Sequence, residues 1–368
     1  MIKFLDLKSQ YKSIKSEINK EIRNTLNKSN FVLGPEVEKF EKNFASAHGS
    51  KNGIAVNSGT SALHIALVAE NIGRGDEVIT VPMTFTATIA SIIYTGAKPV
   101  LVDVDKKTCT IDVKKIEQKI TKKTKAIIPV HLYGQPANMD PILALAKKYD
   151  LIVIEDCAQA HLGKYKNKFV GNIGNYGCFS FYPGKNLGAY GEGGIVITND
   201  KNKSEKIRML RDWGQEGKYN HVMLGFNYRM DGIQGAILNV KLKYLNEWTN
   251  KRRIIAKKYE KMLKKSNIKF CLENKLTKHV YHIFSIFHHD RDQLKNYLTK
   301  FGIQTGLHYP VPIHLQKAYR KFGIYGRNGD FPVSEFIANN QLSLPIYPEL
   351  NIKSLKVVVD KIKEFNEI

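Results

Sequence analysis

One lysine in this sequence has neighbours that set it apart from the others. Lys185 follows the apolar stretch 176–180, and five glycines occur in the eleven residues from Gly184 to Gly194. Glycines allow tight turns and leave open space beside a side chain. A lysine amine in such a loop loses its proton more readily than a solvated one and can attack an aldehyde or ketone. The competing interpretation is a surface lysine at a loop edge.

Two further groups could work with this amine. Asp156 follows the apolar run 151–155, and ligands of open α/β sheets bind at the carboxyl ends of strands. A carboxylate there can keep a pyridine nitrogen protonated, although a helix N-cap is the alternative. Thr60 and Ser61 lie in Asn-Ser-Gly-Thr-Ser before an amphipathic stretch at 62–72. They could bind a phosphate at a helix N-terminus, or simply cap that helix.

The elements that would position these residues follow from the hydrophobic pattern. Short apolar runs, which we interpret as strands, occur at residues 53–56, 77–81, 99–102, 126–130, 151–155, 176–180 and 194–198. They alternate with amphipathic stretches, which is typical of a mostly parallel sheet with helices between its strands.

The later part of the chain has a different pattern. Helical periodicity occurs at 201–213 and 231–263, followed by a strand at 282–287, a helix at 292–301 and a turn at 302–305 into another strand. We therefore predict an α/β protein with a large domain at residues 1–250, which includes an N-terminal helical segment. A smaller C-terminal α+β domain would comprise residues 251–368.

Composition excludes several classes of protein. The 368 residues are 43% hydrophobic and 25% charged, which is ordinary for a globular chain with a core. No secretory signal and no run of ~18 apolar residues is visible, so we expect a cytoplasmic protein without a membrane partner. The four scattered cysteines, Cys109, Cys157, Cys178 and Cys271, indicate neither a disulfide framework nor a metal site.

The net charge of +23 would attract polyanions. However, lysine pairs such as Lys147 and Lys148 fall between apolar positions, as on solvated helix faces. No basic arm or nucleic-acid motif accompanies the charge, so we favour a protein that does not bind nucleic acid. An anionic small substrate is compatible with the charge.

The order of the motifs resembles a known family. A Ser-Gly-Thr turn at 58–60, an Asp-x-x-Gln at 156–159 and a Ser-Phe-x-x-x-Lys at 180–185 are similar to the DegT/DnrJ/EryC1/StrS family of sugar aminotransferases. The similarity covers nearly the whole chain and includes the stretches 4–7, 31–36, 75–78, 131–134, 225–229, 308–314 and 342–345. It implies a fold-type I pyridoxal-phosphate (PLP) transferase with a large, mixed, mostly parallel seven-stranded sheet flanked by helices. Such enzymes are homodimers with active sites at the subunit interface.

The resemblance assigns roles around the cofactor. Lys185 would bond to PLP and serve as the general acid and base. Asp156 would face the pyridine nitrogen, Gln159 would approach the ring hydroxyl, and Phe85 would stack on the ring. For Phe85 the alternative is an ordinary core aromatic. Relatives with histidine at the position of Lys185 are dehydratases or deoxygenases, so the lysine argues against that branch.

The same resemblance predicts the phosphate and substrate contacts. The cofactor phosphate would be held by Thr60, Ser61, Ser180 and, from the partner chain, Asn227. The diphosphate of the substrate would be near Arg229 and the segment 218–221, which contains Tyr219 and His221. The sugar pocket would include Tyr182, His308, Tyr309 and His314, although His308 and Tyr309 could equally be a buried structural pair.

These roles define an expected reaction. An amino donor, with glutamate preferred, would convert the cofactor to pyridoxamine phosphate, and a nucleotide-linked keto-sugar would then receive the amino group. We predict a dTDP-3-keto-6-deoxyhexose as substrate and a dTDP-3-amino-3,6-dideoxyhexose as product. UDP-linked 3-keto sugars and 4-keto sugars are alternatives. A catalytically silent regulatory or binding protein on the same fold is the alternative from another class.

Overall fold

A seven-stranded sheet forms the centre of the structure. The computed structural model describes residues 1–264, 266, 268–324 and 326–367. In sheet order the strands are β1 (Asn52–Val56), β9 (Gly194–Thr198), β8 (Tyr176–Ser180), β5 (Ile152–Asp156), β4 (Thr124–Ile127), β2 (Glu77–Thr80) and β3 (Lys98–Leu101). Only β9 runs antiparallel to its neighbours in this sheet. The predicted mixed, mostly parallel sheet is confirmed.

The predicted strands all form, but some end earlier than the apolar runs. β4 ends at Ile127 rather than at Val130. Pro129 has no N–H to donate, so regular pairing stops before it. Val130 makes only an isolated bridge with Asp156.

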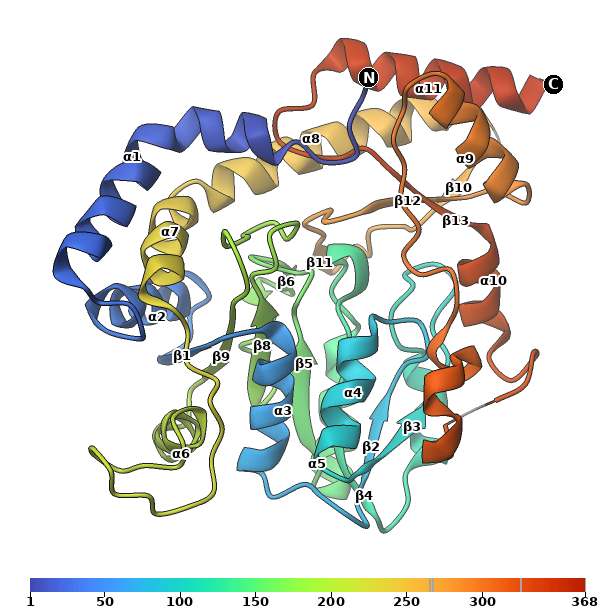
Figure 1. Ribbon diagram of the computed structural model, residues 1–368. Coiled ribbons are helices and arrows are strands. Elements are labelled where there is room, and N and C mark those ends of the chain that lie inside the picture. Colours follow the sequence, from blue (N-terminus) through green and yellow to red (C-terminus); the bar gives the residue numbers. More distant parts are fainter. Residues whose placement is uncertain (265, 267, 325, 368) are drawn as a thin grey trace.

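Helices cover both faces of this sheet (Figure 1). They are α2 (Pro35–Ala47), α3 (Gly59–Ala69), α4 (Thr86–Tyr94), α5 (Met139–Tyr149), α6 (Lys201–Arg211) and α7 (Gly232–Leu242). Alternate residues of β9 show the two layers: Val196 packs in the cluster with α3 and α6, whereas Ile195 and Ile197 pack in the cluster with α2 and α7. Burial on both faces explains why the strands are apolar at nearly every position.

The helix after the Ser-Gly-Thr turn differs from the prediction. α3 begins at Gly59 and ends at Ala69, and all but one of the residues from Ser61 to Ala69 are buried. The expected amphipathic character is wrong, because α3 lies between the sheet and its neighbours α4 and α6 and so has almost no solvent face.

The C-terminal part forms a smaller α+β unit. It contains a three-stranded antiparallel sheet of β10 (Lys269–Phe270), β12 (Phe284–Phe287) and β13 (Gln341–Leu344). Its helices are α9 (Arg291–Lys300), α10 (Pro332–Asn340) and α11 (Ile352–Glu367). The strand expected after residues 302–305 is wrong, since Ile303 and Gly306 make only isolated bridges. A second small sheet joins β11 (Thr277–Lys278) to β6 (Lys164–Tyr165) and β7 (Lys168–Phe169).

Two long helices connect the parts. α1 (Leu7–Lys28) lies along α7, and the predicted helical stretch 231–263 forms two helices, α7 and α8 (Leu245–Leu263). α8 runs across residue 250 without a break, so the division into domains at that residue stays a prediction.

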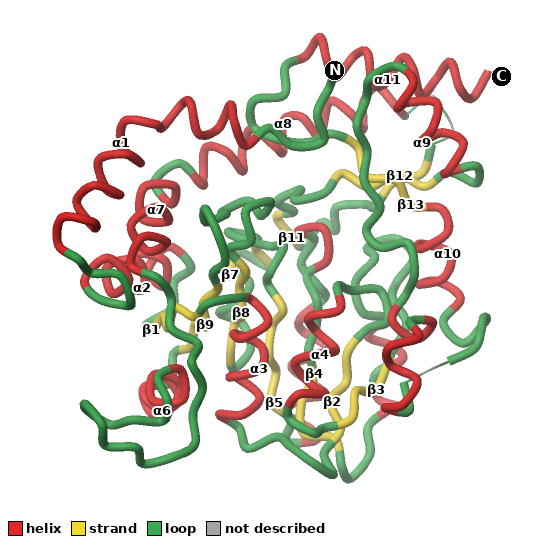
Figure 2. Tube along the Cα trace, viewed as in Figure 1, coloured by secondary structure: helices red, strands yellow, loops and turns green. Residues whose placement is uncertain are grey.

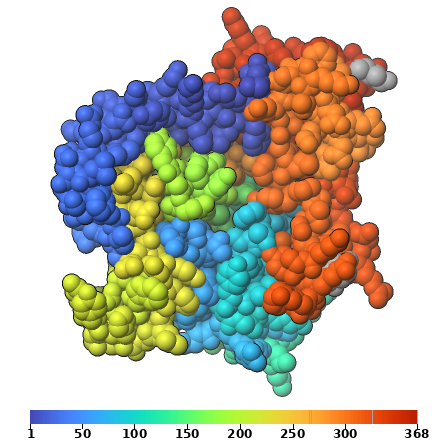
Figure 3. Space-filling model, viewed as in Figure 1, coloured from blue at the N-terminus to red at the C-terminus, as the bar shows by residue number. Residues whose placement is uncertain are grey.

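The amino terminus packs on the C-terminal unit. Ile2 pairs with Ile303, and its N–H donates to Gly302 O at 2.8 Å. Figure 3 shows the blue N-terminal residues against the orange C-terminal segment. Figure 2 shows that loops fill the region between the large sheet and the upper helices. Among the described residues, no helix has the length and apolar character needed to cross a membrane.

The cysteines and the paired lysines lie in different surroundings. Cys109, Cys157, Cys178 and Cys271 are free and buried. Lys147 and Lys148 are exposed on α5, as expected for a solvated helix face.

Phe179 gives a test of the packing that supports β8. It is fully buried, with ring centroids 5.0 Å from Phe44 and 4.8 Å from His48. We expect Phe179→Ala to lower the free energy of unfolding by about 3–5 kcal/mol, because the lost contacts leave a cavity. Urea unfolding measures this change. Phe322→Ala, at a side chain that is 40% exposed, should change stability by less than about 1 kcal/mol, and equal losses would contradict the assignment.

Candidate active site

Lys185 lies in the turn that follows β8. Its N–H donates to Tyr182 O at 2.8 Å, which closes the first turn of the loop. A Cβ at Gly188 would lie 2.3 Å from Pro183 O, so the loop can fold this tightly only with glycine there. The glycine-rich sequence therefore holds the lysine at the end of a central strand, as predicted.

The environment of Lys185 favours its neutral form. Burial lowers the pKa of Lys185 to about 8, while the negative charge of Asp156 opposes this change. Among the described residues, no side chain forms a hydrogen bond or ion pair with its amine. A small fraction of Lys185, larger than for a solvated lysine, is therefore a free amine near neutral pH, which is the form that attacks a carbonyl carbon.

Asp156 ends β5, the neighbour of β8 in the sheet. Its carboxylate is 4% exposed and accepts hydrogen bonds from Thr88 Oγ1 at 2.8 Å and from Ala158 N at 3.1 Å. Burial raises the pKa of Asp156, and the two hydrogen bonds and the charge of Lys185 oppose the rise. Residues 157–163 form turns rather than a helix, so the helix-cap alternative is wrong.

Gln159 is fixed between two tyrosines. Its Oε1 accepts from Tyr133 N at 2.6 Å, and its Nε2 donates to the Tyr309 hydroxyl at 3.0 Å. The Tyr309 ring lies 5.6 Å from the Phe85 ring, which is 53% exposed. Because Phe85 is exposed, its interpretation as a core aromatic is wrong. Tyr309 contacts both Gln159 and Phe85, which the resemblance assigns to the cofactor ring.

The Ser-Gly-Thr turn begins α3. Ser58 caps the helix, with its Oγ accepting from Ser61 N at 3.0 Å. A Cβ at Gly59 would lie 2.6 Å from the Cβ of Ser180, so glycine lets the helix start and the end of β8 meet. Thr60 lies in the first turn, where backbone N–H groups and the helix dipole favour an anion.

These residues fit PLP. A phosphate matches the helix start with Thr60, Ser61 and Ser180. A protonated pyridine nitrogen matches the buried carboxylate of Asp156, which otherwise lies in an unfavourable place for a charge. An aldehyde matches the free amine of Lys185.

The described contacts of the predicted substrate residues in segment 218–229 do not include Lys185. Tyr219 is 79% exposed, and His221 Nδ1 lies 2.9 Å from Trp213 O. Arg229 pairs with Asp212 at 3.2 Å and donates from Nε to Asn227 Oδ1 at 3.1 Å.

Asn227 lies against the phosphate turn of its own chain through its backbone. Its carbonyl oxygen accepts from Asn57 Nδ2 at 3.2 Å, and the residue is exposed. Its assignment to the partner's phosphate stays a prediction.

The remaining sugar-pocket residues divide into two sets. Burial lowers the pKa of His308 to about 4, and the positive charge of the nearby Lys185 contributes to the lowering. Its Nδ1 lies 2.8 Å from Ser343 Oγ. Tyr182 is exposed on the glycine-rich loop. His314 is fully buried, with Nε2 3.0 Å from Glu335, and the described contacts do not bring it to Lys185.

Several residues that support the site are not predicted by the sequence motifs. Thr88 orients Asp156, and Glu155 accepts from His131 Nε2 at 3.0 Å and from three backbone N–H groups. A charged residue inside an apolar strand was the available signal for Glu155. Thr88 gave none, because a threonine in a helix has no special pattern.

The fold and this site define a PLP-binding transferase. The family model described as the DegT/DnrJ/EryC1/StrS aminotransferase family matches residues 12–363. The chain belongs to this family, and it is an aminotransferase whose cofactor is pyridoxal phosphate.

Curated relatives match over almost their full length. A "Pleiotropic regulatory protein" of Geobacillus stearothermophilus is 45% identical, covering 99% of this chain and 98% of the relative. The dTDP-3-amino-3,6-dideoxy-α-D-galactopyranose transaminase of Aneurinibacillus thermoaerophilus is 43% identical, covering 99% of each. A UDP-N-acetyl-3-dehydro-α-D-glucosamine 3-aminotransferase of Acidithiobacillus ferrooxidans is 40% identical, covering 98% of this chain and 97% of the relative.

Solved structures agree with the fold. DesV of S. venezuelae, in complex with a ketimine intermediate, is 40% identical with a TM-score of 0.97, covering 100% of this chain and 99% of DesV. NtdA of Bacillus subtilis, with the cofactor PMP bound, is 30% identical with a TM-score of 0.89, covering 97% of this chain and 82% of NtdA.

The pKa of Lys185 predicts a pH dependence. In the cofactor-free protein, acylation of Lys185 should rise with pH through a midpoint near 8, because burial lowers its pKa from 10.5 to about 8. Ordinary solvated lysines titrate near 10.4. Competitive labelling with acetic anhydride, read by mass spectrometry, measures the midpoint. Asp156→Asn should lower it further, since the negative charge of Asp156 raises the pKa of Lys185; a midpoint above 10 would contradict the assignment.

Proposed function

We propose that this enzyme transfers an amino group to carbon 3 of a nucleotide-linked 3-keto sugar. The preferred substrate is a dTDP-3-keto-6-deoxyhexose, the product is a dTDP-3-amino-3,6-dideoxyhexose, and glutamate is the amino donor. The observation that carries the proposal is the free, partly neutral amine of Lys185 beside the buried Asp156 carboxylate. The transaminase of A. thermoaerophilus, which matches along the whole chain, supports the choice of sugar.

The site residues suit this chemistry. Bound PLP supplies the electron sink that stabilises negative charge on the reacting carbon. Lys185 moves a proton at that carbon, which its lowered pKa allows near neutral pH. Asp156 holds a proton on the ring nitrogen, and Thr88 fixes the orientation of its carboxylate. Phe85, whose ring centroid lies 5.6 Å from that of Tyr309, would stack on the cofactor ring, and Gln159 donates a hydrogen bond to the Tyr309 hydroxyl.

A nucleotide diphosphate requires positive charge at the entrance. Arg229, with Tyr219 and His221 of segment 218–221, would meet the diphosphate, although Arg229 now pairs with Asp212. A UDP-linked 3-keto sugar is the second candidate, because the chain is similar to the UDP-sugar transaminase of A. ferrooxidans. A 4-keto sugar is the third candidate.

We also propose a homodimer in which Asn227 of one subunit serves the site of the other. The segment around Asn227 has exposed apolar side chains, including Leu224 at 95% and Val222 at 49% exposure. Such side chains on an exposed loop are expected at a subunit interface. The hydrogen bond from Asn57 Nδ2 to Asn227 O places this segment beside the phosphate turn of its own chain.

The name of the "Pleiotropic regulatory protein" of G. stearothermophilus favours the regulatory alternative. The presence of Lys185, Asp156 and Gln159 in mutually supporting positions argues against loss of catalysis. A protein that only bound a ligand would not require a lysine amine held free and partly neutral.

A panel of keto-sugars tests the substrate. We expect glutamate-dependent amination of dTDP-3-keto-6-deoxyhexoses, with UDP-linked 3-keto sugars slower and 4-keto sugars unreactive, followed by mass spectrometry of the product. Lys185→Ala should lose at least about 10²-fold in rate, because the acid–base group is removed. Amination of 4-keto sugars alone would show the assignment of carbon 3 to be wrong.

Mixed dimers test the shared site. Lys185→Ala and Asn227→Ala proteins, each impaired alone, are unfolded together, refolded and assayed. If Asn227 serves the partner, each mixed dimer contains one site with both residues intact, and activity should reappear. If Asn227 serves its own subunit, both sites of a mixed dimer carry one change and no activity returns. Refolded Lys185→Ala protein alone is the control.

A further inference from the structure

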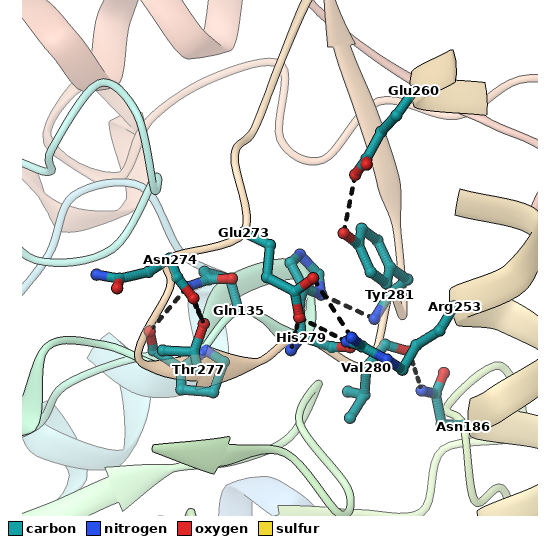
Figure 4. A network of polar contacts seen from close by, with 11 residues as sticks. Gln135, Asn186, Arg253, Glu260, Glu273, Asn274, Thr277, His279, Val280 and Tyr281 are labelled. Carbon is teal, nitrogen blue, oxygen red and sulfur yellow. Dashed lines mark hydrogen bonds and ion pairs between the residues drawn. The ribbon is translucent and has the colours of Figure 1, made fainter. Parts of the chain in front are cut away.

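Val280 links two walls of the active site through its backbone. It lies in the connection between β11 and β12, in the C-terminal unit. Its N–H donates to Gly134 O at 3.0 Å. Its carbonyl oxygen accepts from Asn186 Nδ2 at 3.1 Å, as Figure 4 shows. Asn186 directly follows Lys185. Val280 of the C-terminal unit therefore contacts the loop that carries Lys185 (the lysine loop, residues 181–193) through Asn186. It contacts the rest of the large domain through Gly134.

The Gly134 side of this link leads to Gln159. A Cβ at Gly134 would lie 2.8 Å from Val280 Cγ2 and 3.0 Å from Gln159 O, so only glycine allows this approach. The preceding residue, Tyr133, donates its N–H to Gln159 Oε1 at 2.6 Å. The position of Val280 is thus tied to the position of Gln159.

The Asn186 side uses both ends of one buried amide. Asn186 is 4% exposed, and its Oδ1 lies 3.3 Å from His282 Nδ1. Asn186 Nδ2 donates to the Val280 carbonyl oxygen, and this fixes the orientation of the amide. Asn186 Oδ1 can only accept, so His282 must donate to it from Nδ1. Burial and the positive charges of Lys185 and Arg252 hold the pKa of His282 well below its usual value, so the ring carries one proton.

The segment that carries Val280 is firmly held by the C-terminal unit. Arg253 of α8 bonds Glu273 and His279 O, each at 2.5 Å, and His279 N donates to the same Glu273 carboxylate at 2.8 Å. Tyr281 stacks on His279 with ring centroids 3.9 Å apart and bonds Glu260 at 2.9 Å. Figure 4 shows these contacts on both sides of Val280. The segment is a fixed support rather than a free loop.

We propose that Asn186 is a positioning residue, which holds the Lys185 loop against Val280 and His282 and so keeps the lysine amine desolvated and in register with Gln159. Asn186 does not touch the reacting atoms in this role. The link also makes the C-terminal unit part of the catalytic geometry. The proposal concerns amino transfer itself and does not depend on which sugar is aminated.

Two variants test the hydrogen bonds apart from the packing. Asn186→Ala removes the amide, and Asn186→Leu fills a similar volume without hydrogen bonds. In each, the acylation midpoint of Lys185 in the cofactor-free protein should rise by about one pH unit, because the amine becomes more solvated. In the cofactor-loaded enzyme, kcat should fall by about 10–100-fold with KM changed by less than about threefold, since misplaced catalytic groups slow chemistry more than binding.

Asn239→Ala is the matched control. The Asn239 amide also bonds at both ends, donating to Glu36 O at 2.9 Å and accepting from Asn43 Nδ2 at 2.9 Å, but it lies between α2 and α7. In Asn239→Ala, the acylation midpoint of Lys185 and the kcat should match those of the unmodified protein. Midpoints in both Asn186 variants equal to the control would overturn the proposal. A shift in the alanine variant alone would assign Asn186 to packing, and failure of both variants to fold would assign it to stability; either result overturns the proposal.

Discussion

The placing of a half-buried lysine near a buried carboxylate is the condition on which the site depends. Removal from water disfavours the ammonium form of Lys185 and the carboxylate form of Asp156, while each charge favours the other. The outcome is an amine that titrates near neutral pH and a carboxylate able to meet a positive ring nitrogen. A site open to water would leave Lys185 protonated, and a site without Asp156 would give a cofactor ring no partner for its charge.

The fold meets this condition because β5 and β8 end next to each other. β5 and β8 are parallel neighbours, so Asp156 and the loop after Ser180 emerge at the same edge of the sheet. Gly59 brings the start of α3 against Ser180. The C-terminal unit then covers the lysine loop, and Val280 connects that loop to the wall that holds Gln159.

Much of the fold could be predicted because burial leaves a simple pattern. Strands covered on both faces are apolar at almost every position, which made all seven recognisable. Their order in the sheet was not predictable, because β1 pairs with β9 across a separation of more than a hundred residues. α3 was misjudged as amphipathic, although residues 62–69 are apolar at every position except His64, which is typical of a buried helix.

The residues with distinctive chemistry were evident from the sequence alone: a lysine among glycines, an aspartate at a strand end and hydroxyls at a helix start. Residue type and short spacing determine these features, because they depend on local backbone geometry. The tertiary structure alone decided their partners. Thr88 on Asp156, Tyr309 on Gln159 and Asn186 on Val280 are contacts between distant segments. Burial and hydrogen bonding at such contacts depend on how the whole chain packs, and for this reason Lys185 differs from every solvated lysine of the same sequence.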